Sequence, residues 1–138
     1  MNEPVIFLDT NVLLRHIMQD HHDRSYRATA LMVAIEEKQR SVQCADTVIF
    51  EAAFTLEKTY HLPRETIREA LQSFIELPAV VLPGKSIFAG VFALYVANSG
   101  LSIADCYHIE RAKHLTRGSI LSFDRRLGTI NGISREEP

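Results

Sequence analysis

The sequence has few cysteines, no long apolar run and no excess of basic residues. Two cysteines among 138 residues cannot form a disulfide framework, so we expect buried or neutral thiols in a reducing compartment. The longest apolar run, residues 87–97, has 11 residues and is interrupted by Gly90, whereas a bilayer-spanning helix needs about 20. The N-terminal residues carry no basic segment typical of a secretory signal. We therefore expect a cytoplasmic protein without a membrane segment.

The charge balance excludes one class of nucleic-acid binder. With 15 Lys and Arg against 17 Asp and Glu, the net charge is −2, so overall basicity cannot drive binding to nucleic acid, although a local basic rim remains compatible. Apolar residues make up 46% of the chain and charged residues 23%, as in ordinary globular domains. Because no internal repeat or Gly/Ser-rich linker divides the chain, we expect a single domain over residues 1–138.

Apolar runs alternate with segments of helical periodicity. Residues 5–8, 42–45, 79–82 and 119–123 are predicted strands, and the continuous runs are typical of buried parallel strands. Helices are predicted over residues 12–19, 25–39, 48–58, 63–75, 86–98 and 103–115. The third of these is expected to be capped by Asp46 or Thr47, and the last by a Ser102–Asp105 capping box. Strands that alternate with helices imply an α/β/α sandwich with a small central parallel sheet.

Four acidic residues lie where such a fold binds ligands. Asp9 and Asp124 end predicted strands, Asp105 opens a helix, and Glu51 lies in the first turns of another. Ligands of open α/β sheets bind outside the carboxyl ends of the strands. If the four acids converge, their mutual repulsion requires a cation, and carboxylate ligands select Mg²⁺ or Mn²⁺ over zinc. Such a site suits phosphodiester hydrolysis with one or two metal ions.

Each acid also has a purely structural interpretation. Asp9 is a suitable N-cap, Asp105 completes a capping box, and Asp124 is a typical turn residue. Glu51 fits a solvated helix position, although its neighbours are mostly apolar. The ordered set of four is what favours a metal site.

The same residues form four motifs that resemble those of PIN-domain nucleases. The first is FLDTNVLLR over residues 7–15, and the second runs over residues 46–57 with Glu51 as its acid. The third is LSIAD over residues 101–105, and the fourth is SFDRRL over residues 122–127. Their order and spacing cover nearly the whole chain. Among these nucleases, the chain is most similar to the VapC-type toxins of bacterial type II toxin–antitoxin modules.

This resemblance implies a PIN-like three-layer α/β/α sandwich and a Mg²⁺- or Mn²⁺-dependent endoribonuclease that acts on structured RNA such as transfer or ribosomal RNA. It assigns metal binding and catalysis to Asp9, Glu51, Asp105 and Asp124, with Glu51 completing the site or orienting the nucleophilic water. Asn11 and Ser122 match positions that support the acids by hydrogen bonds. The resemblance also implies a cognate antitoxin that blocks the site, and a homodimer.

Several residues and functions stay open on the sequence alone. Arg15 and Arg125 are the preferred RNA-phosphate contacts among the basic residues near the motifs, the alternative being ordinary surface solvation. One alternative function is a catalytically silent PIN-fold module that binds RNA or protein. Another is a metal-dependent phosphatase acting on small esters, although the chain lacks a second aspartate two residues after Asp9.

Overall fold

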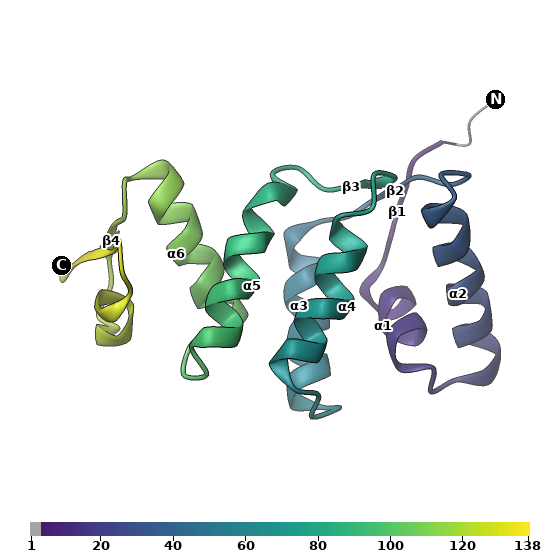
Figure 1. Cartoon of the computed structure of the whole chain (residues 1–138), viewed down its shortest axis with the longest axis horizontal. Coiled ribbons are helices and arrows are strands. Elements are labelled where there is room, and N and C mark those ends of the chain that lie inside the picture. Colours follow the sequence, from purple (N-terminus) through teal and green to yellow (C-terminus); the bar gives the residue numbers. More distant parts are fainter. Residues whose placement is uncertain (1–3) are drawn as a thin grey trace. The chain divides into compact units, whose positions relative to one another are not determined.

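Strands and helices alternate along the computed structural model, which describes residues 4–138 (Figure 1). The chain divides into two compact units, Met1–Lys85 and Ser86–Pro138, and each is described by itself. No helix in the described residues is long and apolar enough to cross a membrane.

The first unit combines three short parallel strands with four helices. The strands pair in the order β1-β2-β3, with Ile6 opposite Val42 and Val42 opposite Val80. Helix α1 packs against α2 and α3, and α3 packs against α4 (Figure 1). The elements are β1 (Ile6–Phe7), α1 (Thr10–Met18), α2 (His22–Glu36), β2 (Val42–Gln43), α3 (Asp46–Lys58), α4 (Arg64–Ile75) and β3 (Val80–Val81).

The helical periodicity read from the sequence places the core of this unit. On α2, Ala28, Met32 and Ile35 are buried, as the i, i+4, i+7 spacing predicts. On α4, Ile67 and Leu71 are fully buried. Helix α3 is N-capped by Ala45 and begins at Asp46, so the expected cap at Asp46 or Thr47 is wrong by one or two residues.

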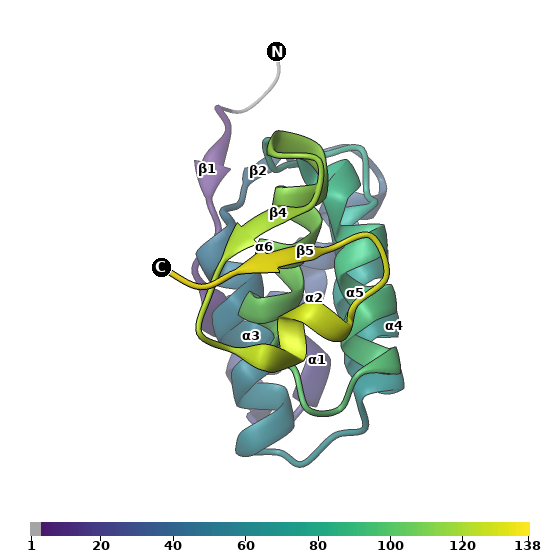
Figure 2. The ribbon, with the colours of Figure 1, turned by 90° about the vertical axis from the view of Figure 1, so that its left-hand side faces the viewer.

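The second unit contains two helices and a parallel strand pair. Helix α5 packs against α6, and β4 pairs with β5 with Ile120 opposite Arg135 (Figure 2). The elements are α5 (Phe88–Ala97), α6 (Ile103–Leu115), β4 (Ser119–Leu121), η2 (Arg125–Thr129) and β5 (Ser134–Glu136); the 3-10 helix η1 (Lys85–Ile87) precedes α5. The predicted helix over residues 86–98 thus begins with a 3-10 turn.

The expectation of deeply buried strands is wrong for two segments. Val5, Ile6 and Phe7 are each more than half exposed, and only Leu8 of that run is buried. Leu121 and Phe123 are also exposed. Strand β1 is the edge of its three-stranded sheet, and β4 is paired only with β5 within its unit. An apolar run alone predicts a strand but does not establish that both its faces are covered.

Both cysteines are buried, as predicted. Burial raises the pKa of the Cys44 thiol to about 11, so this thiol stays protonated at pH 8, and the thiolate is the reactive form. We expect neither Cys44 nor Cys106 to react with a thiol reagent at pH 8 within minutes in the native protein, and both to react after unfolding in urea. Rapid labelling of the native protein would show that these cysteines become exposed by local opening.

Candidate functional site

Asp9 lies at the junction between β1 and α1. Strand β1 ends two residues earlier, at Phe7, and the extended backbone of Asp9 makes it the N-cap of α1. Within the described chain its carboxylate makes no capping hydrogen bond, and the residue is exposed. Asp9 therefore has the backbone position of a helix cap, but its side chain does not perform that role. The carboxylate is available to a ligand.

Glu51 is linked to the start of α1 through Thr10. The Thr10 hydroxyl donates a 3.1 Å hydrogen bond to Glu51 Oε2, which joins α1 to α3. Thr10 is buried, whereas Glu51 is exposed and lies beside the buried Ala52. Glu51 belongs to α3, and the hydrogen bond from Thr10 orients its carboxylate. Asp9, the other predicted acid of the first unit, directly precedes Thr10 in the chain.

Thr10 makes the contact that the sequence analysis assigned to its neighbour. Asn11 was expected to support the acids by hydrogen bonds, but within residues 4–138 the bond to an acid comes from Thr10. Asn11 is exposed and lines a cavity described below. A signal for Thr10 was present, because a hydroxyl side chain follows Asp9 directly.

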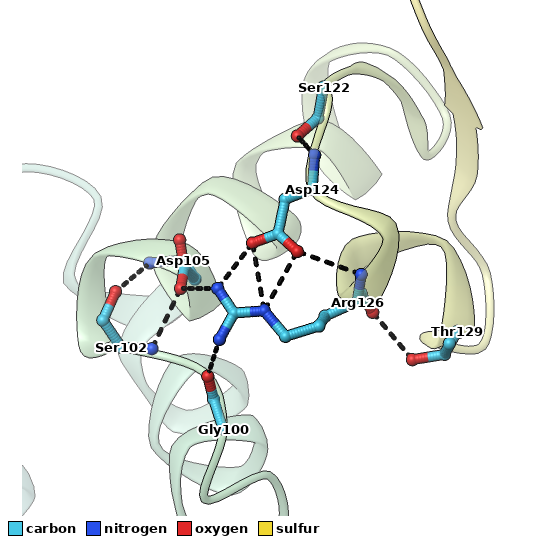
Figure 3. Close-up of polar contacts among 7 residues, drawn as sticks. All are labelled: Gly100, Ser102, Asp105, Ser122, Asp124, Arg126 and Thr129. Carbon is cyan, nitrogen blue, oxygen red and sulfur yellow. Dashed lines mark hydrogen bonds and ion pairs between the residues drawn. The ribbon is translucent and has the colours of Figure 1, made fainter.

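Asp105 is fixed at the first turn of α6 by the predicted capping box. The Ser102 hydroxyl accepts a 3.0 Å hydrogen bond from the Asp105 amide, and Asp105 Oδ2 accepts one of 3.0 Å from the Ser102 amide (Figure 3). This confirms the capping box. The carboxylate is part-exposed, at 28%, so the box orients Asp105 without enclosing it. The structural interpretation and a role in ligand binding are therefore compatible at this residue.

Asp124 lies after β4, where it caps the 3-10 helix η2. Its Oδ1 accepts a 3.0 Å hydrogen bond from the Arg126 amide. The Asp124 amide in turn donates a 3.0 Å bond to the Ser122 hydroxyl (Figure 3). Ser122 thus supports the backbone of this acid rather than its carboxylate. Hydrogen bonds to the residues before and after Asp124 therefore fix the turn and orient its carboxylate.

One guanidinium joins the two acids of the second unit. Arg126 donates to both oxygens of Asp124, with distances of 2.9 Å from Nε to Oδ1 and 2.6 Å from Nη2 to Oδ2. The same Nη2 lies 3.8 Å from Asp105 Oδ2 (Figure 3). The hydrogen bond from this side chain holds the pKa of Asp124 below its usual value, and Asp124 raises the pKa of Arg126. At neutral pH the Asp124 carboxylate and the Arg126 guanidinium are therefore both charged.

Arg125, rather than Arg126, is the RNA-phosphate contact that the sequence predicts near the fourth motif. Arg125 is exposed, and in the described part of the chain its side chain makes no ion pair or hydrogen bond. The side chain of Arg126 instead faces the acids. Helix η2 begins at Arg125, and its first turn directs the Arg126 side chain back toward the N-cap, Asp124. The signal that was missed is the Asp-x-Arg spacing, which lets an arginine bond the cap of its own helix.

The structure thus brings Asp105 and Asp124 together around Arg126 in the second unit. In the first unit it joins Glu51 to Thr10, the residue that follows Asp9. Among residues 4–138, no three or more His, Cys, Asp or Glu side chains form a group that could hold a metal ion. Joint action of all four acids at one metal site remains a prediction.

The Asp105–Asp124 pair has the donor chemistry of a hard-cation site. The carboxylates of Asp105 and Asp124 are directed at the same guanidinium, so their oxygens converge on one positive group. Oxygen donors of this kind are the ones that Mg²⁺ and Mn²⁺ prefer. The residues present in this pair therefore fit a divalent ion.

A basic cavity of about 430 Å³ lies beside α1 and α2, close to Asp9 in sequence. Arg15 is held there by Asp20 at 3.0 Å and by the Tyr60 hydroxyl at 3.2 Å. The hydroxyl of Tyr60 also donates to Asp20, which is the main cause of the lowered pKa of that carboxyl. The cavity is lined by Asn11, Val12, Arg15, Arg24, Arg27 and Ala28.

Of the three arginines that line the cavity, Arg24 has the fewest side-chain interactions. Arg27 pairs with Asp23 at 2.8 Å one helical turn away. Within residues 4–138 the Arg24 guanidinium has no ion pair or hydrogen bond. Among the described residues that line the cavity there is no carboxylate, so its chemistry suits an anion such as a phosphate group.

Comparison with known proteins agrees with the motifs. The family profile of the PIN domain matches residues 6–133, which confirms the predicted three-layer α/β/α PIN fold with its small parallel sheet. No match to a curated protein was found. The PIN fold is a nuclease-type fold, and nucleases with this domain generally use divalent metals. Because the match spans all four acidic motifs and nearly the whole sequence, the chain belongs to the PIN domain family.

Proposed function

We propose that this protein is a Mg²⁺- or Mn²⁺-dependent endoribonuclease. The observation that carries the proposal is the Asp105–Asp124 pair, whose carboxylates converge on one cation in a chain that belongs to a family of nucleases. The geometry supports a hard-cation site, and the family supports nuclease chemistry. RNA as the substrate rests on the resemblance of the four motifs to those of VapC-type toxins.

The acids take different roles in this proposal. Asp9, Asp105 and Asp124 would hold the ion directly or through water, and Glu51 would complete the site or orient the attacking water. When bound, the ion lowers the pKa of that water and stabilises the charge that develops on the phosphate. Thr10 keeps Glu51 oriented through its 3.1 Å bond, and Ser102 does the same for Asp105 through the capping box.

The cellular role proposed here is that of the toxin in a type II toxin–antitoxin module. A cognate antitoxin that blocks the site, a homodimer and a single-domain organisation over residues 1–138 belong to the same proposal. What supports them is the similarity of the motifs at residues 7–15, 46–57, 101–105 and 122–127 to those of the VapC-type toxins. A short reading frame directly upstream, whose product relieves growth arrest on co-expression, would support this role.

Cleavage of total bacterial RNA by the purified protein tests the nuclease proposal. We expect discrete fragments with Mg²⁺ or Mn²⁺, and none with chelator, because the carboxylates alone cannot activate water. A small chromogenic phosphate ester should stay intact in the same buffer. Intact RNA under every metal condition would contradict the nuclease proposal, and hydrolysis of the ester would favour a phosphatase.

A catalytically silent binding module is the second candidate, and Arg126 is the observation in its favour. Clustered carboxylates without an ion are unstable through mutual repulsion, but Arg126 already supplies a positive charge to two of them. A silent module would keep this arrangement and bind RNA without cleaving it. The same assay separates the two candidates, since the silent module leaves the RNA intact and shows no metal dependence.

The basic cavity provides a further prediction about RNA binding. Because the Arg24 guanidinium is free to pair with a phosphate, we expect Arg24→Gln to weaken binding of bulk transfer RNA in chelator. Loss of one phosphate contact should lower the slope of log affinity against log salt by about 0.7–0.9. Fluorescence anisotropy over a range of salt concentrations measures both quantities. Arg68→Gln, on α4 and bonded to Gln72, is the matched control, and equal slopes in the two variants would exclude the cavity from RNA binding.

A further inference from the structure

The guanidinium of Arg126 lies between the carboxylates of Asp105 and Asp124 (Figure 3). Its guanidinium presents nitrogen atoms to three different groups. Nε and Nη2 bind the carboxylate of Asp124, Nη2 also faces Asp105, and Nη1 donates to the carbonyl oxygen of Gly100. The acceptors come from the loop before α6, from α6 itself and from Asp124, the N-cap of η2. One side chain therefore ties together three segments of the second unit.

The oxygens that Arg126 occupies are the ones that a divalent ion requires. Both oxygens of Asp124 accept hydrogen bonds from the guanidinium, at 2.9 Å and 2.6 Å. On Asp105, Oδ2 accepts from the Ser102 amide as well as facing Arg126. A divalent ion at the pair needs at least one oxygen of Asp124, so it competes directly with the guanidinium.

The side chain of Arg126 is able to leave. It is 57% exposed, and solvent competes for ion pairs of this kind. The Asp124 turn does not depend on the guanidinium alone, because the Asp124 amide donates to the Ser122 hydroxyl and Asp124 Oδ1 accepts from the Arg126 amide. The capping box likewise holds Asp105. The two carboxylates keep their places when the arginine moves away.

We propose that Arg126 is the resident cation of the Asp105–Asp124 pair and sets the concentration at which a divalent metal ion binds there. Without the ion, the guanidinium balances the two negative charges and keeps the pair together. The metal ion binds by displacing the guanidinium from Asp124. This inference rests on the proposed function in one respect, namely that this pair of acids is a metal site.

The test is calorimetric titration of the whole metal-free protein with Mn²⁺. We expect Arg126→Gln to bind Mn²⁺ about 5–10-fold more tightly than the wild type, which corresponds to about 1–1.4 kcal/mol at 1.4 kcal/mol per tenfold. Arg125→Gln makes the same charge change one residue away, on a side chain that does not contact the acids, and should change the affinity less than twofold. Arg126→Lys keeps the positive charge but cannot bind both oxygens of Asp124 as the guanidinium does. Its affinity for Mn²⁺ should lie between those of the wild type and Arg126→Gln.

A second measurement uses the wild-type protein and does not depend on any variant folding. The Nε–H resonance of Arg126 in a nitrogen–proton correlation spectrum should shift as Mg²⁺ is added, because its bond to Asp124 is lost. The Nε–H resonance of Arg125 should stay in place. A shift that saturates together with the calorimetric binding curve supports displacement.

The outcomes separate this inference from the proposed function. If wild type, Arg126→Gln and Arg125→Gln bind Mn²⁺ equally, the metal site stands and the role of Arg126 is refuted. Weaker binding in Arg126→Gln also refutes it, because the arginine would then organise the site rather than compete for it. If no protein binds Mn²⁺, including Arg126→Gln, the metal site itself fails and the inference fails with it.

Discussion

Replacing Asp9 with asparagine is expected to reduce RNA cleavage by roughly 10²–10³-fold while leaving the stability of the protein unchanged. The loss follows from removing one of the charges that would hold the catalytic ion. Stability should be preserved because the Asp9 carboxylate makes no capping bond within the described chain, and asparagine is an equally good N-cap residue. Initial rates of fragment formation and a thermal unfolding curve measure the two effects.

Asp9 is a sharper test of the site than the other aspartates. Asp105 and Asp124 both cap helices, so their substitution changes stability as well as chemistry. The control is Glu65→Gln, which makes the same carboxylate-to-amide change at an exposed position of α4. Cleavage that survives Asp9→Asn would mean that the site is wrongly placed or that the activity belongs to a contaminant.

Gly118→Ala should cause a large loss of stability, about 3 kcal/mol. Gly118 has a φ of +88°, which side-chain-bearing residues rarely adopt, and a Cβ there would lie 2.0 Å from the carbonyl oxygen of Gly132. That contact is with backbone, which cannot rotate away. The residue also connects the end of α6 to β5, since its amide donates to Ala112 and its carbonyl accepts from Ser134. Urea denaturation measures the free energy of unfolding.

Gly100→Ala is the matched control for this prediction. A Cβ at Gly100 meets nothing within 4 Å, and its backbone does not have a positive φ, so the change in unfolding free energy should stay within about 0.5 kcal/mol. Equal stability of the two variants would show that the close approach of Gly118 to Gly132 is not maintained in solution.

Local patterns were enough to predict most of the secondary structure. The spacing of Ile67, Leu71, Phe74 and Ile75 predicted α4 and its buried face, because helical periodicity is a property of neighbouring residues. The capping box of α6 was predicted for the same reason, as its two partners are three residues apart. Parallel pairing also followed from the alternation of strands and helices.

Contacts between distant segments were not predictable from these patterns. The bond from Thr10 to Glu51 spans 41 residues, and the one from Arg126 to Gly100 spans 26. The Asp-x-Arg spacing indicates the bond from Arg126 to Asp124, but the approach of Arg126 to Asp105 and Gly100 depends on segments that are distant in the sequence. The exposure of Val5, Ile6 and Phe7 was missed because covering a strand depends on elements far away in the sequence. The four acids, in contrast, were recognisable from their order along the chain.

The pairing of β5 with β4 has a consequence for which mutations this region tolerates. The two strands are joined through main-chain groups, with the Ser134 amide donating to Gly118 and the Ser122 amide donating to Glu136. Arg135 adds a side-chain bond of 2.8 Å to the carbonyl of Ser122, two residues before Asp124. We therefore expect the pairing of β5 to depend mainly on its main-chain groups. We expect positions 134 and 136 to tolerate other strand-forming residues, whereas Arg135 is constrained by its side-chain bond. Proline at position 134 should not be tolerated, because it lacks the amide that donates to Gly118.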